Sequence, residues 1–241
     1  MENEKQNYIK EAFQKIQIEL TSEQVCQFEQ YYEYLVKKNE VMNLTAITEF
    51  QEVVQKHFVD SLMIRELLEP ESGAYWLDLG TGAGFPGIPL KIVYPKLRLV
   101  LLDSLNKRVK FLQEVIEMLG LKDIEAVHGR AEEMARKPEY REKFDCCVSR
   151  AVANLSSLSE YCLPFVRVNG CFVPYKSEKI QEERKDAEKA VQILGGKIEG
   201  QKELYLPDSD IYRCLLLIRK EKPTPKKYPR KAGTPTKEPI R

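Results

Sequence analysis

The chain lacks the features that mark exported, membrane-spanning and metal-binding proteins. No apolar run approaches the roughly 18 residues that a membrane helix needs, and no signal peptide begins the sequence. Only two histidines are present, and the six cysteines form no C-x-x-C pair. We therefore expect no disulfide framework, no metal site and no membrane contact. The expectation is a soluble, cytoplasmic protein with reduced cysteines.

A glycine turn is the most informative segment that is present. A short apolar run, Tyr75–Leu77, leads into Asp-Leu-Gly-Thr-Gly-Ala-Gly at 78–84. Glycines are needed where the backbone takes a positive φ or lies against a ligand, so the turn predicts a cofactor site. Residues 82–87 also match the dinucleotide pattern G-x-G-x-x-G, whose first glycine normally stands directly at the strand end. Here the strand is predicted to end near Asp78, four residues earlier.

The better register is acid-x-Gly-x-Gly-x-Gly, which begins at Asp78 and includes Gly80 and Gly82. It resembles the first motif of class I methyltransferases that use S-adenosylmethionine (SAM). This cofactor carries no phosphate and presents an ammonium, a carboxylate, a ribose diol and an adenine. A carboxylate near the ammonium and bare backbone near the ribose suit it. Asp78, Gly80 and Gly82 are therefore candidate cofactor-binding residues.

Asp103 is the second candidate acid. It ends the apolar run 97–102 and lies 19 residues after Gly84, near the spacing at which an acid meets a ribose hydroxyl. Dinucleotide and SAM enzymes share this acid, so it indicates a nucleoside without choosing between them. The apolar spacing that follows predicts a helix over 105–119, with Ser104 as its cap and Gly120 at its end.

Strands and helices alternate through the rest of the chain. Further strands are predicted at 124–127, 144–149, 170–176, 197–206 and 211–219, and helices at about 154–163 and 178–194. The last two strands leave no room for a helix between them and must form an antiparallel hairpin. The fold class is therefore α/β: a Rossmann-like, seven-stranded sheet of the class I SAM-dependent methyltransferase type with a terminal antiparallel hairpin. A dehydrogenase would need a further substrate domain, so SAM is favoured.

About 70 residues before the sheet are predicted to be helical. Capping boxes start at Thr21 and Thr48, and apolar residues follow each at helical spacing. His57 and Ser61 share a helix face four residues apart. A single histidine beside Asp60 is more often a structural hydrogen-bonding group than a catalyst. We expect an N-terminal helical subdomain at 1–70, a SAM-binding domain at 71–220 and a tail at 221–241.

The tail has an unusual charge. From Arg219 to Arg241 there are nine Lys and Arg against two Glu, whereas the remaining residues carry 29 basic and 35 acidic groups. Five of the thirteen prolines also lie there, so the tail is predicted to form neither a helix nor a core of its own. It is interpreted either as a solubilising segment or as a strap that neutralises RNA phosphates, with Tyr228 available to stack on a base.

Taken together, the motifs resemble the RsmG (GidB) family, bacterial methyltransferases of a guanine N7 in 16S ribosomal RNA. The resemblance runs from the N-terminal helices to the last prolines. The matching segments are Asn43-Leu44-Thr45, His57 with Asp60-Ser61, the glycine turn with Pro86 and Pro89, Asp103-Ser104 with Lys107-Arg108, Arg130-Ala131-Glu132, Ser149-Arg150-Ala151 and Lys227-Tyr228-Pro229-Arg230.

The resemblance implies a set of site residues. Gly80 and Phe85 would line the SAM pocket, with Asp103 at the ribose. Ala131 and Glu132 would bracket the adenine.

Arg150 would sit where the methyl donor and the base meet, as a substrate-positioning residue that bonds guanine O6, a phosphate or the SAM carboxylate. No catalytic residue is assigned beyond this candidate, and Lys176 is a candidate rim residue for RNA. The implied partner is 16S rRNA, the small ribosomal subunit or its assembly intermediate.

The chemistry of guanine N7 explains what the sequence does not contain. This nitrogen has an in-plane lone pair and no proton, so its attack on a methyl group needs no general base. Methylation of an exocyclic amine would use an N-P-P-Y-like turn after the fourth strand, and methylation of cytosine C5 would use the thiolate of a Pro-Cys pair. The sequence has neither feature, so both reactions are disfavoured. The target base must leave its stack, which is easiest in a single-stranded loop. A SAM enzyme acting on a small molecule and a non-catalytic rRNA-binding assembly factor remain as alternatives.

Overall fold

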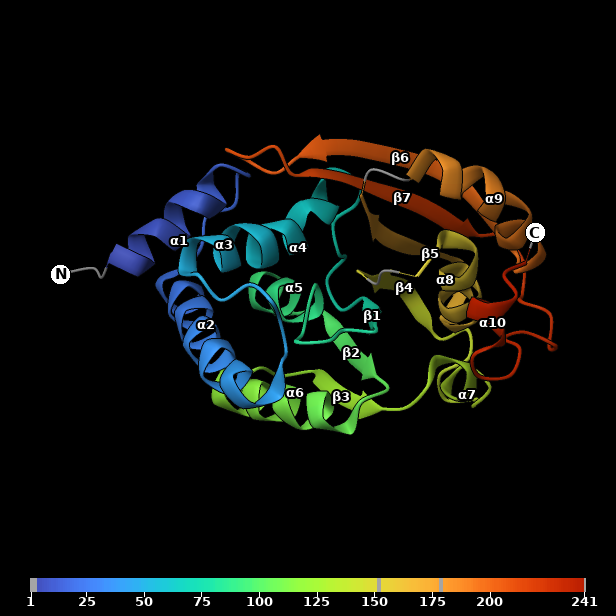
Figure 1. Ribbon diagram of the computed structural model, residues 1–241, viewed down its shortest axis with the longest axis horizontal. Coiled ribbons are helices and arrows are strands. Elements are labelled where there is room, and N and C mark those ends of the chain that lie inside the picture. The colour runs from blue at the N-terminus through green and yellow to red at the C-terminus, as the bar shows by residue number, and fades with distance from the viewer. Residues whose placement is uncertain (1–3, 151–152, 178–179, 241) are drawn as a thin grey trace.

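A seven-stranded sheet in the order β3-β2-β1-β4-β5-β7-β6 runs through the molecule (Figure 1). The computed structural model describes residues 4–150, 153–177 and 180–240. The strands are β1 (Tyr75–Leu79), β2 (Arg98–Asp103), β3 (Ile124–His128), β4 (Phe144–Ser149), β5 (Val166–Lys176), β6 (Gly196–Tyr205) and β7 (Tyr212–Lys220). The first five are parallel, and β7 is antiparallel to β5 and β6. The predicted fold class, with its terminal hairpin, is confirmed.

Helices cover both faces of this sheet (Figure 1). One face carries α1 (Glu4–Gln14), α2 (Ser22–Met42), α3 (Phe50–Val53), the π-helix η1 (Val54–Val59), α4 (Asp60–Leu62), the 3-10 helix η2 (Met63–Glu66), α5 (Gly87–Val93) and α6 (Asn106–Met118). The other carries α7 (Ala131–Met134), α8 (Leu155–Cys162), the 3-10 helix η3 (Leu163–Phe165), α9 (Ile180–Ile193) and α10 (Thr234–Lys237). Successive strand residues alternate between the two cores, as the pleat requires.

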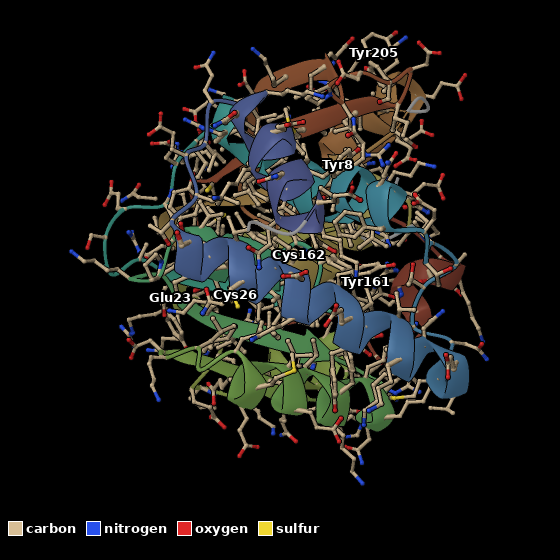
Figure 2. The ribbon with its side chains drawn as sticks, turned by 90° about the vertical axis from the view of Figure 1, so that its left-hand side faces the viewer. Tyr8, Glu23, Cys26, Tyr161, Cys162 and Tyr205 are labelled. Carbon is tan, nitrogen blue, oxygen red and sulfur yellow. The ribbon has the colours of Figure 1, made fainter. Side chains whose placement is uncertain are left out.

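The N-terminal helices share one core with α5, α6 and the sheet. Figure 2 shows the side that α1 and α2 cover, with Tyr8 on α1 and Cys26 on α2. The buried ring of Tyr31 lies 5.4 Å from Phe58 and 5.5 Å from Phe85, between centroids. Aromatic contacts thus join α2 and η1 to the loop after β1. None of the described helices is both long enough and apolar enough to span a bilayer.

The capping boxes predicted near the N-terminus have different outcomes. Thr21 caps α2 as predicted: its Oγ1 accepts from the Gln24 amide at 3.2 Å, and the Gln24 side chain accepts from the Thr21 amide at 2.9 Å. The second box is wrong by one residue. Glu49, not Thr48, is the cap of α3, and its carboxylate accepts from the Glu52 amide at 2.8 Å. Either side chain can accept an orphan helix amide, so the sequence pattern alone did not separate them.

Ser104 does not cap α6, contrary to prediction. Leu105 is the N-cap residue, and the Asp103 carboxylate accepts from its amide at 2.8 Å. The acid at the end of β2 thus holds the residue that precedes the helix, and no described side chain caps the first turn of α6. The predicted end of this helix is confirmed at Gly120, whose φ is +63°.

The C-terminal tail is docked on the body, and the prediction that it forms no helix is wrong. Residues 234–237 form α10, and Tyr228 is only 8% exposed, so its ring is not available to stack on a base. The Arg141 guanidinium donates to the carbonyl oxygens of Tyr228 and Thr224 at 3.0 and 2.8 Å. Proline-rich backbone has few amides but many free carbonyls, so arginines on the body can hold it.

The packing of α5 on the sheet leaves no space for a side chain at Gly87. A Cβ at this position would lie 2.3 Å from Leu101 Cδ2 and 2.8 Å from Asp78 Oδ2. Gly87→Ala should therefore lower the free energy of unfolding by about 1–3 kcal/mol in urea titrations, the usual cost of overpacking. Gly200→Ala is the control, because its Cβ would meet nothing closer than 3.6 Å. Equal effects of the two variants would contradict this packing.

Candidate cofactor and substrate site

The turn after β1 depends on positive backbone dihedrals. Gly80, Gly82 and Gly84 have φ values of +71°, +63° and +104°. A Cβ at Gly84 would lie 2.5 Å from Ile88 and 2.7 Å from the Tyr31 hydroxyl, whereas one at Gly82 would meet no atom within 4 Å. The third glycine thus allows close packing, and the second exposes bare backbone.

Asp78 is buried beneath this turn. Its Oδ2 accepts from the Thr81 hydroxyl at 2.6 Å and the Gly87 amide at 2.8 Å. Its Oδ1 is buried and has no hydrogen-bond partner among the described residues. Burial raises the pKa of the carboxyl to about 7, against the lowering effect of these two donors. The site therefore contains one unused acceptor that a cationic group would stabilise.

Asp103 braces the same turn from β2. Its Oδ2 accepts from the Gly82 amide at 3.0 Å and lies 3.5 Å from the Arg108 guanidinium, and the carboxylate is almost fully buried. The two acids found by sequence therefore contact one turn from neighbouring strands. Parallel strands make this possible because their carboxyl ends meet at one edge of the sheet.

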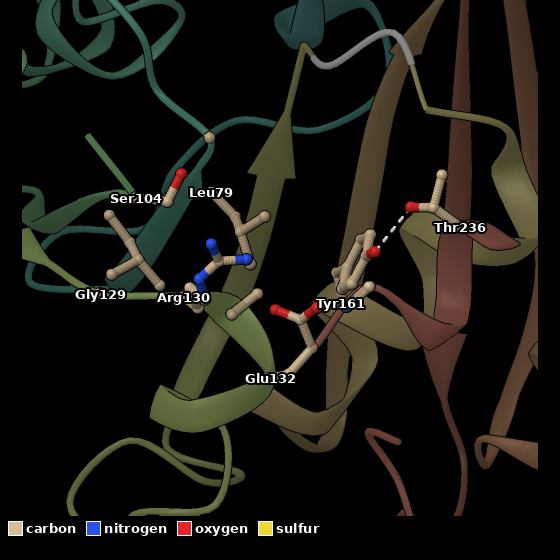
Figure 3. A pocket seen from close by; sticks show the side chains of 11 residues that line it. Leu79, Ser104, Gly129, Arg130, Glu132, Tyr161 and Thr236 are labelled. Carbon is tan, nitrogen blue, oxygen red and sulfur yellow. Dashed lines mark hydrogen bonds between the residues drawn. The ribbon is translucent and has the colours of Figure 1, made fainter. Parts of the chain in front are cut away.

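A cavity of about 320 Å³ opens at this edge (Figure 3). Strand ends and the turns after them supply Leu79, Gly80, Leu102, Ser104, Gly129, Arg130, Ala131 and Glu132, while α8 and the tail supply Tyr161, Gly233 and Thr236. Its size falls in the range of about 300–1,000 Å³ that is typical of ligand pockets.

Phe85 and Arg150 lie outside this cavity lining, in a separate cluster. The Arg150 guanidinium lies 5.0 Å from the Phe85 ring centroid, and the ring of His57 stacks on Phe85 at 4.4 Å. The buried Asp60 receives hydrogen bonds from Arg150 and Arg213, both at 2.9 Å.

His57 is a neutral member of this cluster. Arg150 NH2 lies 3.1 Å from its Nδ1, and arginine can only donate, so Nδ1 accepts. Its Nε2 lies 2.9 Å from the Thr45 hydroxyl and is therefore the protonated nitrogen. Burial, followed by the Arg150 charge, lowers the His57 pKa to about 3. The ring is held as a structural hydrogen-bonding group.

Lys176, the candidate rim residue for RNA, is buried and paired within the protein. It is 8% exposed, pairs with the Glu183 carboxylate at 2.6 Å and donates to the Ala153 carbonyl at 2.9 Å. Its position at the end of β5 was foreseen, but α9 packs over it. The quoted motif residue Ala151 lies outside the described residues.

Comparison with known proteins decides the family. The family model described as GidB, rRNA small subunit methyltransferase G, matches residues 24–210. The chain is 54% identical over 230 residues to the ribosomal RNA small subunit methyltransferase G of Lachnoclostridium phytofermentans, covering 95% of each. It is 52% identical to that of Alkaliphilus metalliredigens, covering 97% of this chain and 98% of the relative. The chain belongs to the GidB family.

A solved structure supports the fold of this GidB-family chain. M. jannaschii TYW2 in complex with AdoMet superposes with a TM-score of 0.55 at 14% identity, over 73% of this chain and 79% of that one. Family and fold together make the protein a SAM-dependent methyltransferase.

The described residues fit SAM. The orphaned Asp78 Oδ1 suits an ammonium, the space beside the Gly82 Cα is open, and the cavity beside Gly80 has the volume of a ligand pocket. Within the described ranges, no group of three or more His, Cys, Asp or Glu is arranged to hold a metal ion.

Several lining residues were missed from the sequence. Ser104, Gly129 and Arg130 are direct neighbours of predicted residues, and their positions after strands were the available signal. Tyr161 and Thr236 had no such signal, because only the packing of α8 and the tail brings them to the strand ends.

Asp78 should give a distinct pH dependence of stability. Its pKa of about 7 in the folded protein lies above the ordinary value of 3.8. Between these values the folded state keeps a proton that the unfolded state releases, so stability falls as the pH rises. Relative to Asp78→Asn, wild-type unfolding free energy should fall by up to about 1.4 kcal/mol per pH unit across this window. Parallel profiles would contradict the raised pKa, and the exposed Asp210→Asn serves as control.

Proposed function

We propose that the protein transfers the methyl group of SAM to N7 of a guanine in 16S ribosomal RNA. The single observation that carries the proposal is the cavity at the carboxyl ends of β1, β2 and β3, lined by Gly80, Ala131 and Glu132 in a chain of the GidB family. The acceptor is 16S rRNA in the small ribosomal subunit or an assembly intermediate, and the location is the cytoplasm.

The chain positions the reactants rather than exchanging protons with them. Bound SAM supplies an electrophilic methyl group. Asp78 and the glycine turn would hold the methionine end, Asp103 the ribose, and Ala131 and Glu132 the adenine. Guanine N7 carries a lone pair and no proton, so a neutral His57 that is bonded on both ring nitrogens is compatible with the reaction. Orientation of N7 against the methyl group can lower the barrier by up to roughly 7–11 kcal/mol.

The surface of the docked tail supports an RNA partner. Lys226, Lys227 and Lys231 remain exposed although the backbone around them is held on the body. Their ammonium groups can neutralise phosphates, which makes RNA binding weaken as the salt concentration rises.

Methylated rRNA provides the direct test. Mass mapping of 16S rRNA from cells without this gene should show the loss of one N7-methylguanine, and the wild-type gene should restore it. An unchanged set of methylated guanines would contradict the proposed activity. Loss of a different modified nucleotide would contradict the assignment of N7.

Arg150 is proposed as a substrate-positioning residue, and Arg213 is its matched control. Both side chains donate to the buried Asp60 at 2.9 Å, but only Arg150 also contacts Phe85 and follows β4. Arg150→Ala should lower kcat/KM for rRNA methylation by at least about tenfold, a cost expected for lost orientation. Arg213→Ala loses an ion pair with the same carboxylate and should retain most of the activity. Equal losses of kcat/KM in both variants would show that Arg150 acts only as a structural partner of Asp60.

A further inference from the structure

The C-terminal tail forms one wall of the cofactor cavity. Gly233 and Thr236 line it directly, opposite the strand ends of β1, β2 and β3 (Figure 3). The hydroxyl groups of Thr236 and Tyr161 lie 2.8 Å apart, so the tail and α8 meet at the cavity through a hydrogen bond. A segment that the charge pattern assigns to RNA therefore contacts the place where a nucleoside would sit.

A buried ion pair anchors this wall. Glu160 on α8 is fully buried, and the Arg230 guanidinium donates to both of its oxygens, at 3.0 and 2.7 Å. The Arg230 amide also donates to Glu160 at 2.7 Å. Loss of such a partner would leave a buried carboxylate without compensation and would strongly destabilise the folded protein. The pair therefore fixes the path of the tail next to the cavity.

The residues that follow Arg230 are fixed to α8 by serines. The Ser157 hydroxyl donates to the Pro235 carbonyl at 2.6 Å, and the Ser156 hydroxyl donates to the Ile240 carbonyl at 2.7 Å. Pro235 is itself buried. The one-turn helix α10 thus has defined contacts on both sides of Thr236.

Glu132 connects the tail to the cofactor site. Its Oε1 accepts from the Gly233 amide at 2.9 Å, and its side chain also lines the cavity. Figure 3 shows the Glu132 carboxylate and the Tyr161 ring facing the same space. One carboxylate therefore contacts the tail and, under the proposed function, the adenine.

We propose that residues 232–237 are a cofactor-binding element, which closes the nucleoside end of the SAM pocket and docks more firmly when the cofactor is bound. The inference rests on the proposed use of SAM. Because Glu132 contacts both the tail and the cavity, each should stabilise the position of the other, and this coupling is reciprocal. The tail thereby acts on the methyl donor as well as on any RNA at its outer surface.

Two truncations and calorimetric titration with S-adenosylhomocysteine, the demethylated product, test the proposal. Removal of residues 232–241 deletes Gly233 and Thr236 but keeps the Arg230–Glu160 pair. Removal of residues 238–241 deletes the Ser156–Ile240 hydrogen bond but keeps both lining residues, so it is the matched control for a lost docking contact. The first truncation should weaken ligand binding about tenfold or more, as the loss of a pocket wall and one or two hydrogen bonds predicts. The second should stay within about threefold.

Point variants cover the case in which the longer truncation fails to fold. Thr236→Val removes the hydroxyl that bonds Tyr161 and should weaken ligand binding by about threefold or more. Thr234→Val, in the same turn but outside the cavity lining, is its control. Thermal unfolding without ligand shows whether each variant is folded.

Hydrogen exchange supplies an independent measurement. Amides of residues 230–237 in the wild-type chain should exchange more slowly when S-adenosylhomocysteine is added, because the ligand favours the docked tail. Unchanged exchange, together with unchanged ligand affinity in Thr236→Val, would overturn the proposal.

The outcomes separate this inference from the proposed function. If the wild-type chain binds neither SAM nor S-adenosylhomocysteine, the proposed function itself fails. If the wild-type chain binds the ligand and the folded 232–241 truncation binds it equally well, only the role of the tail is overturned. Retained ligand affinity with weakened rRNA binding would assign the tail to RNA alone.

Discussion

The buried carboxylate of Asp78 is the constraint on which the site depends. A carboxylate removed from water must receive hydrogen bonds, and here they come from Thr81 and the Gly87 amide. Those two bonds hold the turn, and Gly87 at the start of α5, against the end of β1. Asp103 then holds the Gly82 amide from the next strand. The glycine turn is thus shaped by two acids, and Asp78 Oδ1 keeps an unused acceptor, which the proposed function assigns to the cationic end of the ligand.

The docked tail changes how its basic charge is explained. Arg230 is used in a buried ion pair with Glu160, and Arg141 holds tail carbonyls, so several of the cations around the tail act within the protein. The charge of these two arginines is therefore explained without an RNA substrate. The assignment of an RNA substrate rests on family membership and on the exposed lysines. The same docking brings Gly233 and Thr236 to a cavity most of whose other lining residues stand at or just after the strand ends, far away in the sequence.

Much of the fold was predictable because it depends on local periodicity. The seven strands, the terminal hairpin and the cap at Thr21 follow from alternation, spacing and side-chain chemistry. The capping errors are each one residue long: Glu49 is the N-cap instead of Thr48, and Leu105 is the N-cap instead of Ser104. In the site, Gly80 was named from the glycine motif, and Ala131 and Glu132 were named from the family resemblance; the three residues meet at one cavity. Phe85 and Arg150 were named from a resemblance, and they lie together against His57 and Asp60 instead.

The sequence alone determined the class of fold and the cofactor, because the alternation of strands and helices, the glycine motif and the acids at the ends of the first two strands are patterns that can be read along the chain. The tertiary structure decided that Lys176 is buried under α9, that Tyr228 is packed rather than free, and that Gly233 and Thr236 line the cofactor cavity. These outcomes depend on contacts between segments distant in the chain. Burial and charge pairing act through space, so no local pattern encodes which distant carbonyl or carboxylate a given arginine will reach.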